Sequence, residues 1–142
     1  MKLHLITVGA PKLDYAKLGF AEYQKRLGHY HQLRVTHIAD KHNDAGHILA
    51  AAGDSYTIGL VIEGKQHTSQ ELAKFLESNA LHSKELSFLI GGPDGLPTEV
   101  IDQLDYRWSL GKLTLPHDLA MVVLVEALYR ASTITAGQPY HR

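Results

Sequence analysis

The chain contains no cysteine among its 142 residues. This absence excludes disulfides, thiolate metal sites and a thiol nucleophile, and it fits a reducing compartment. The chain also lacks an excess of positive charge, since 14 lysines and arginines stand against 15 acidic residues. Charge alone therefore does not indicate nucleic-acid binding. No apolar run is long enough for a signal peptide or a membrane span, so we expect a cytoplasmic protein.

The composition that is present is typical of a soluble globular protein, with 44% hydrophobic and 20% charged residues. The length is that of one ordinary domain. Because we find no repeat, low-complexity tract or linker, we predict a single domain over residues 1–142.

Strand-like and helix-like segments alternate along the chain. This order predicts an α/β fold, a mostly parallel sheet with helices on both faces. A hydroxyl at position 68 or 69 is a suitable cap for the third helix. The expected strands are Leu3–Val8, Leu33–Ala39, Tyr56–Ile62, Leu86–Ile90 and Trp108–Leu110, and the expected helices are Leu13–Leu27, Ala45–Ala52, one after Thr68 or Ser69, and His117–Ala136.

The stretch FLIGGPDGLP, residues 88–97, runs from a predicted buried strand into a loop with three glycines and two prolines. It matches neither the dinucleotide-binding glycine pattern nor the phosphate-binding loop. One interpretation is a tight turn with Pro93 and Asp94 at its centre. The other is a ligand-binding loop, because open α/β sheets bind ligands beyond the carboxyl ends of their strands.

A second loop, SLGKLTLPHD, joins a strand to the last helix, whose first turn holds His117 or Asp118. Residues 119–125 of that helix are all apolar. A helix that is apolar nearly all round is buried on several sides, which predicts a partner subunit. Glu126 and Arg130, four residues apart, are expected to form an ion pair. The terminal GQPYHR is either a frayed end or a tail suited to RNA contact.

Ten histidines are present, including the pairs His29 with His31 and His42 with His47. Neither spacing matches a ligand pattern backed by carboxylates, so we expect no metal site.

The order LIGGPDG, WSLGKLTLPH, EALYRA and terminal PYHR resembles the RlmH-type family of SPOUT methyltransferases, which methylate N3 of a pseudouridine in large-subunit (23S) ribosomal RNA. The opening MKLHLITVG and the segment GLVIEGKQHTS are also similar to that family, so the resemblance covers the whole chain. Three features depart from the family pattern. The region His29–Ser55 is short, Met121 stands where an arginine is usual near the presumed RNA face, and Asp94 replaces a glutamate.

This resemblance implies a C-terminal trefoil knot and S-adenosylmethionine as cofactor, held in a cleft that Gly64 also lines. Because a chain of near-neutral charge should not bind free RNA well, we expect the assembled ribosome as its partner, and the apolar run Leu119–Val125 predicts a homodimer through the last helix and the neighbouring loop. His141 is then the candidate base, Arg142 a contact to phosphate or base, and Tyr140 a stacking ring. The implied cofactor-binding residues are Leu60, Gly91, Gly92, Leu110, Gly111, Lys112, Leu113, Thr114 and Leu115.

Two alternatives stay open at this point. One is a SPOUT enzyme acting on transfer RNA, which would share the knot and the cofactor but not the PYHR tail. The other is a nucleotide-binding α/β module without catalysis.

Overall fold

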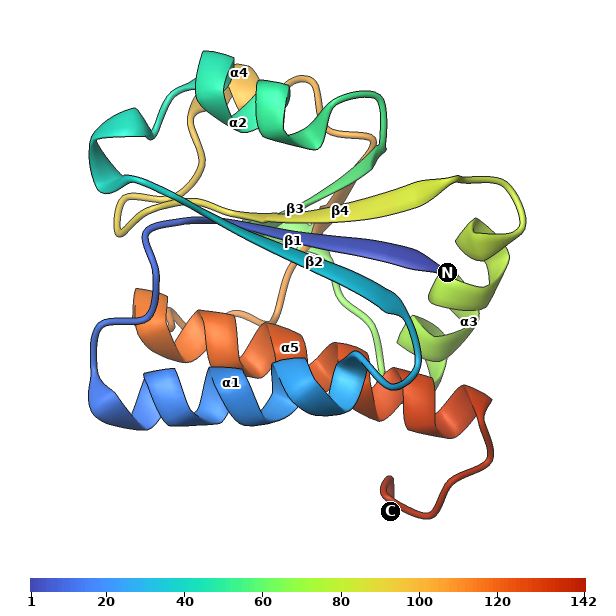
Figure 1. The fold of residues 1–142 in the computed structure, drawn as a ribbon. Helices are drawn as coiled ribbons and strands as arrows, with labels where there is room; N and C mark the ends of the chain where they lie inside the picture. Colours follow the sequence, from blue (N-terminus) through green and yellow to red (C-terminus); the bar gives the residue numbers. More distant parts are fainter.

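The computed structural model describes all residues 1–142. Five parallel strands form one sheet in the order β2-β1-β4-β3-β5. Figure 1 shows α1 and α5 side by side under one face, with α2 and α4 over the other. The predicted parallel sheet with helices on both faces is therefore confirmed. The elements are β1 Lys2–Val8, α1 Asp14–Leu27, β2 Gln32–Ile38, η1 Asp40–His42, α2 Ala45–Ala52, β3 Tyr56–Lys65, α3 Ser69–Ala80, β4 Glu85–Ile90, α4 Thr98–Ile101, β5 Tyr106–Trp108 and α5 His117–Thr135.

Two hydrophobic cores lie on opposite faces of the sheet, because successive side chains of a strand point to opposite faces. In β1, Leu3 and Leu5 belong to the larger core under α1, α3 and α5, whereas Ile6 and Val8 belong to the smaller core under α2. Every residue of β4 after its first is buried, as expected for a central strand of a parallel sheet.

The third predicted helix begins with a capping box. The Thr68 hydroxyl accepts from the Glu71 amide at 3.0 Å, and the Glu71 carboxylate accepts from the Thr68 amide at 2.7 Å. Of the two capping residues that the sequence allows, Thr68 is the one used. These hydrogen bonds lower the pKa of Glu71, the bond from the Thr68 amide first.

The last strand differs from its prediction. We expected Trp108–Leu110, but β5 is Tyr106–Trp108. The Ser109 amide makes one more hydrogen bond to β3, at the carbonyl of Lys65, and Gly111, with φ of +136°, then turns the chain away. Partner strand β3 continues to Lys65, past the predicted end at Ile62, through an irregularity between Leu60 and Lys65. The short helix α4 was not predicted.

Candidate functional site

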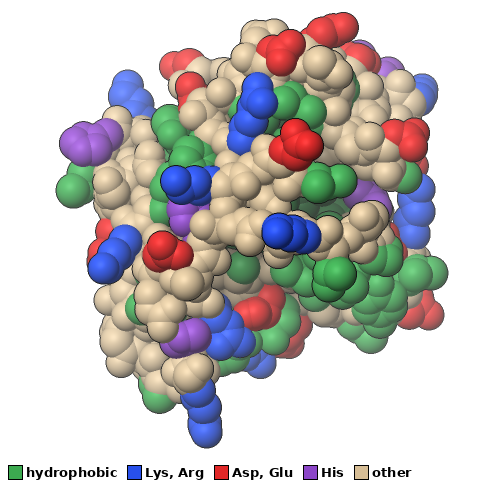
Figure 2. Space-filling view, turned by 180° about the vertical axis from the view of Figure 1, so that it is seen from behind, with side chains coloured by type: hydrophobic (Ala, Val, Ile, Leu, Met, Phe, Trp, Pro, Cys, Tyr) green, Lys and Arg blue, Asp and Glu red, His purple; other side chains and the backbone are tan.

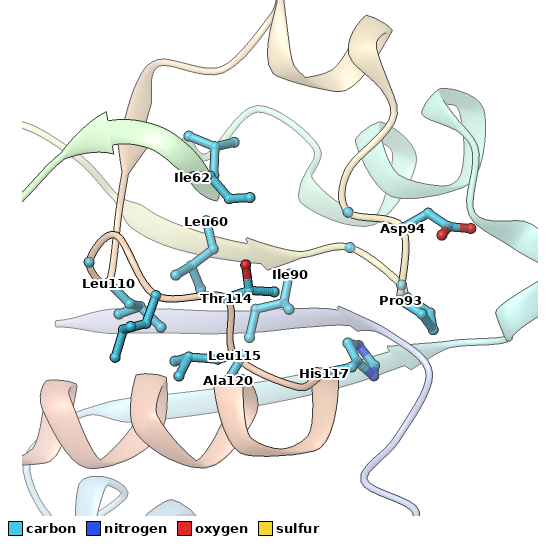
Figure 3. A pocket seen from close by; sticks show the side chains of 16 residues that line it. Leu60, Ile62, Ile90, Pro93, Asp94, Leu110, Thr114, Leu115, His117 and Ala120 are labelled. Atoms are coloured by element: carbon cyan, nitrogen blue, oxygen red, sulfur yellow. The ribbon is translucent and has the colours of Figure 1, made fainter.

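A cavity of about 280 Å³ lies at the carboxyl edge of the sheet. Its walls come from the end of β3, the glycine loop after β4, the loop before α5 and the first turns of α5. Figure 3 shows Leu60, Ile90, Leu110 and Leu115 converging on this space, while the Asp94 side chain points away from it. Figure 2 shows the corresponding hollow, surrounded by hydrophobic side chains and with cationic side chains near its margin. The cavity thus combines apolar walls with exposed loop backbone, as small-molecule sites commonly do.

The glycine loop is both a tight turn and a wall of this cavity. The Gly95 amide donates to the Gly92 carbonyl at 2.8 Å, which places Pro93 and Asp94 at the centre of the turn. A Cβ at position 91 would lie 2.2 Å from the carbonyl carbon of Gly95, closer than any real contact. Only glycine fits there. The tight turn is therefore confirmed, and the loop also lines a cavity, but that a ligand binds there stays a prediction.

The loop before α5 is fixed by its own hydrogen bonds and by α1. The Ser109 hydroxyl donates to the Gly111 carbonyl at 3.0 Å and accepts from the Gly111 amide at 3.1 Å. In the first turn of α5, the Asp118 carboxylate accepts from the backbone amides of Lys12 and Leu13, at 2.7 Å for Leu13. This carboxylate therefore accepts hydrogen bonds from amides outside α5 and holds the start of α1 against the start of α5. The start of α5 forms one side of the cavity.

The structure gathers eight of the nine predicted cofactor residues around this one cavity, from segments far apart in sequence. Lys112 is the exception, and Gly64 lies instead against the backbone of Arg107 and Trp108. That the eight bind a cofactor stays a prediction. They are Leu60, Gly91, Gly92, Leu110, Gly111, Leu113, Thr114 and Leu115.

Sequence reasoning missed part of the lining. Val61, Ile62, Ile90, His117 and Ala120 also face the cavity. The residues of β3 could have been found, since they follow Leu60 at the end of a strand. His117 and Ala120 could not, because only the packing of α5 brings its first turn under the loop.

The predicted catalytic tail lies at the other end of α5. The helix ends at a glycine in the left-handed region, Gly137 with φ of +69°, and the Gln138 amide donates to the Thr133 carbonyl at 2.9 Å. These features form a Schellman motif, which turns the chain back. The tail then lies along α5, and His141 comes within 3.2 Å of Arg130 and of Gln70. In this structure the tail does not touch the cavity.

Tyr140 is part of an aromatic cluster. Its ring packs against Tyr129 with centroids 4.7 Å apart, and its hydroxyl lies 3.2 Å from that of Tyr23. The Arg130 guanidinium lies 4.8 Å from the Tyr140 ring centroid. Burial, together with the hydrogen bond to Tyr23, raises the pKa of Tyr140 to about 12. Tyr140 therefore stays protonated at neutral pH, and its ring is packed within the chain rather than free to stack.

The apolar run of α5 is covered more fully than its sequence suggested. Met121, Leu124 and Val125 are each 0% exposed within the single chain. Val122 is half-buried beside Gly19 of α1. The expectation that position 121 faces RNA is wrong, because the Met121 side chain lies in the core under the sheet.

One of the two histidine pairs, His42 with His47, lies close to a carboxylate, which the spacing of the two histidines did not predict. The potential ligand atoms of His42, Asp44 and His47 lie within 4.8 Å of one another. Asp44 caps α2, however, and accepts from both the backbone amide and Nδ1 of His47 at 2.9 Å. The two imidazole rings are stacked 3.9 Å apart at 12°. Nitrogen lone pairs lie in the ring planes, so nearly parallel rings do not converge on one ion. We interpret the cluster as a helix cap.

The family model described as "Predicted SPOUT methyltransferase" matches residues 1–141. A protein of Deinococcus radiodurans named "Ribosomal RNA large subunit methyltransferase H" is 55% identical, and the match covers 100% of this chain and 99% of that protein. Relatives with the same name from Deinococcus deserti and Bifidobacterium adolescentis are 52% and 40% identical, each over 100% of both chains.

Solved structures of lower identity share the fold. A probable methylase family protein from Haemophilus influenzae superposes with a TM-score of 0.61 at 11% identity, over 99% of this chain and 70% of that one. A tRNA (m1G37) methyltransferase from Aquifex aeolicus gives 0.57 at 13% identity, over 91% and 69%. No helix in the structure has the length and apolar character needed to cross a bilayer.

Proposed function

Because the chain belongs to the SPOUT methyltransferase family, we propose that it transfers a methyl group from S-adenosylmethionine to N3 of a pseudouridine in 23S ribosomal RNA. The observation that carries this proposal is the full-length match, at 40–55% identity, to relatives named for large-subunit ribosomal RNA. The transfer RNA enzyme shares only the fold at 13% identity and gives no support for that substrate. Action on ribosomes implies a cytoplasmic protein.

The cavity fits S-adenosylmethionine in its chemistry. Leu60, Leu110 and Leu115 supply apolar walls for an adenine ring, and the loops at residues 91–95 and 110–115 offer backbone groups at close range. When bound, the cofactor would supply an electrophilic methyl group on sulfur. Displacement at such a methyl depends mainly on alignment of the nucleophile, so the chain's task is to hold two reactants in line and exclude water.

We propose that the active site is completed by a second copy of the chain. The α5 wall of the cavity is at Ala120, roughly 20 Å along the helix from Thr133, to which Gln138 is bonded. The four residues after Gln138 span at most about 14 Å. While the Schellman motif is intact, the tail of one chain falls short of its own cavity.

The surface beside the cavity supports such a dimer. Leu13, Tyr15 and Leu18 are 58%, 51% and 74% exposed near the start of α1, and Leu113 at the cavity is 82% exposed. Figure 2 shows hydrophobic side chains gathered below the hollow, on the side where α1 and α5 begin. A contiguous apolar surface of this kind commonly marks an interface. A two-fold partner seated there would lie next to the cavity and could deliver its own Tyr140, His141 and Arg142.

We also propose the trefoil knot that the family implies. The chain after β5 returns to the glycine loop, since the loop before α5 and Gly91 line one cavity. A C-terminal segment that packs against an earlier loop is compatible with a threaded chain, which is very rare among proteins. Slow refolding from urea, in a phase that persists in the presence of a prolyl isomerase, would support the knot.

The central experiment is methylation of ribosomes from a strain that lacks the protein. Mass mapping of the 23S RNA should show one pseudouridine without its methyl group, and purified protein with labelled S-adenosylmethionine should restore it. Intact ribosomes, isolated large subunits and free 23S RNA should be compared, because a chain with net charge −1 has little general affinity for RNA. Cofactor binding without transfer to any of these substrates would contradict the proposed function.

The trans arrangement has its own test. A chain truncated after Pro139 keeps its cavity, and Thr114→Trp fills the cavity at an exposed position while keeping the tail. Each alone should be inactive. After the two are mixed and allowed to exchange subunits, roughly a quarter of the wild-type activity should return, since half of the dimers are mixed and each has one complete site. No recovery, with mixed dimers verified, would mean that tail and cavity act within one chain.

A further inference from the structure

Arg130 is held between three groups at the tail end of α5. Its Nε donates to the Glu126 carboxylate at 2.8 Å, its Nη1 lies 3.2 Å from Nδ1 of His141, and its guanidinium carbon lies over the Tyr140 ring. The Arg130 and Glu126 side chains are 30% and 24% exposed. A guanidinium fixed by a carboxylate and an aromatic face is well placed to orient a third group.

The contact with His141 determines which ring nitrogen carries hydrogen. A guanidinium has only donors, so Nδ1 of His141 must accept. A neutral imidazole that accepts at Nδ1 carries its hydrogen on Nε2. Nε2 lies 3.2 Å from the atom placed as the side-chain amide nitrogen of Gln70 in α3. Since amide oxygen and nitrogen are assigned from their hydrogen bonds, this contact is best satisfied with the Gln70 oxygen accepting from His141 Nε2–H.

We infer that Arg130 is a positioning residue that holds His141 as the Nε2–H tautomer, so that His141 donates a hydrogen bond to a carbonyl of the target base instead of removing its proton. This inference rests on the proposed function, and it revises the role that the sequence suggested for His141. Gln70 then occupies the place of the substrate, because its amide presents the same groups, a carbonyl beside an N–H, as the imide edge of pseudouridine.

The chemistry balances without a protein base. The imide nitrogen loses its proton to water, and its electron pair forms the bond to the methyl carbon. The carbon–sulfur bond breaks, and its electron pair stays on sulfur as a neutral thioether. Negative charge on the imide spreads to its two flanking carbonyl oxygens, where a fixed donor stabilises it most. His141 Nε2–H is such a donor, aligned in advance by Arg130.

The decisive comparison is His141→Gln with His141→Ala. The glutamine side chain can place an N–H near the position of Nε2 but cannot act as a base. We expect His141→Ala to lower kcat on ribosomes about 100-fold, as loss of one such donor does elsewhere, and His141→Gln to stay within about tenfold of wild type.

Substitutions at two further positions, Gln70 and Arg130, examine the geometry. Gln70→Ala should lower KM for ribosomes, because the base no longer displaces an internal acceptor, whereas Gln70→Glu should raise it. Arg130→Ala should lower kcat without changing cofactor affinity, and Arg130→Lys should recover part of the loss. Long-range proton–nitrogen NMR of His141 should show one tautomer in wild type and a mixture in Arg130→Ala, independently of activity.

The inference is overturned if folded, cofactor-binding His141→Gln is as inactive as His141→Ala, since His141 would then be the base. Equal KM in both Gln70 variants would also overturn it, because Nε2 would not face the substrate. Failure of the proposed function is a separate result: wild-type protein would not methylate ribosomes, whereas the NMR measurement would still report the His141 tautomer.

Discussion

The two ends of α5 carry different parts of one proposed reaction and are built in different ways. At its start, rigid backbone makes the site: glycines without room for a side chain, a turn closed by a hydrogen bond, and an aspartate that bonds two amides of another segment. At its end, side chains make the site, through tyrosine rings, a guanidinium and an imidazole. Backbone suits a cofactor that must be held in one shape, and side chains suit the handling of a base that comes and goes.

The largest effect should come from the helix between these ends. Val125→Lys places an unpaired charge in a core where the native side chain is 0% exposed, and we expect it to cost about 3–5 kcal/mol and to prevent stable folding. Val122→Lys, on the half-buried side, should leave a folded protein and weaken the dimer. Thermal melts and light scattering check this pair. If Val122→Lys protein remains dimeric at micromolar concentration, α5 is not part of the dimer interface.

The second largest effect should come from the cofactor end of α5, where Gly91 lines the cavity. An Ala Cβ would lie 2.2 Å from the backbone of Gly95, so Gly91→Ala should cost about 3 kcal/mol and abolish S-adenosylmethionine binding in calorimetry. The matched control is Gly92→Ala, whose Cβ would meet the flexible amide of Asn43 at 3.3 Å. It should retain most of the stability and affinity. Equal effects of the two variants would mean that backbone crowding does not define this loop.

The tail end should separate activity from stability. Truncation after Pro139 should lower methyl incorporation into ribosomes at least about 100-fold, because the proposed donor is lost. It should cost only about 1 kcal/mol in stability, from the packing of Tyr140 on Tyr129. Cofactor affinity should change little, since no wall of the cavity comes from the tail. Full activity of the truncated chain would show that the tail is only a packed end.

The smallest effect is a pH dependence of the free energy of unfolding, and it arises at His31, beside the tail end of α5. Burial lowers the pKa of His31 to about 4, and its Nε2 lies 2.8 Å from the Ser132 hydroxyl of α5. A lowered folded-state pKa means that stability is full above pH 6.5 and is lost as the pH falls toward 4. We expect a loss of about 1–2 kcal/mol over that range, after allowance for screening of a partly exposed ring. His31→Gln should flatten this part of the melting profile, and an unchanged slope would assign it to other groups.

Local sequence patterns predicted most of the fold. Four strands, a cap at Thr68 or Ser69, α2 and the limits of α5 within one residue could be read from periodicity and capping residues, because these signals depend on near neighbours. The patterns failed at β5 and α4, short elements that depend on tertiary contacts: β5 pairs with β3, and α4 packs against α2.

The candidate site was likewise predictable from the sequence only in part. The glycine loop and the PYHR tail stand out by composition alone, and the ion pair of Glu126 with Arg130 follows from their spacing. Composition did not reveal that Met121 is core, that the Asp44 carboxylate contacts His47, or that Arg130 contacts His141. Each depends on which faces of separate helices and loops come together.

The sequence by itself determined the parallel α/β architecture and the family, and it predicted which two segments carry the chemistry, since hydrophobic period, glycine content and terminal residue types are local properties. Only the tertiary structure decided that these segments lie at opposite ends of one helix, with Ala120 at the cavity and Arg130 at the tail. The reason is geometric. A rise of about 1.5 Å per residue turns a short separation in sequence into a distance that a four-residue tail does not span, so proximity along the chain does not make one site.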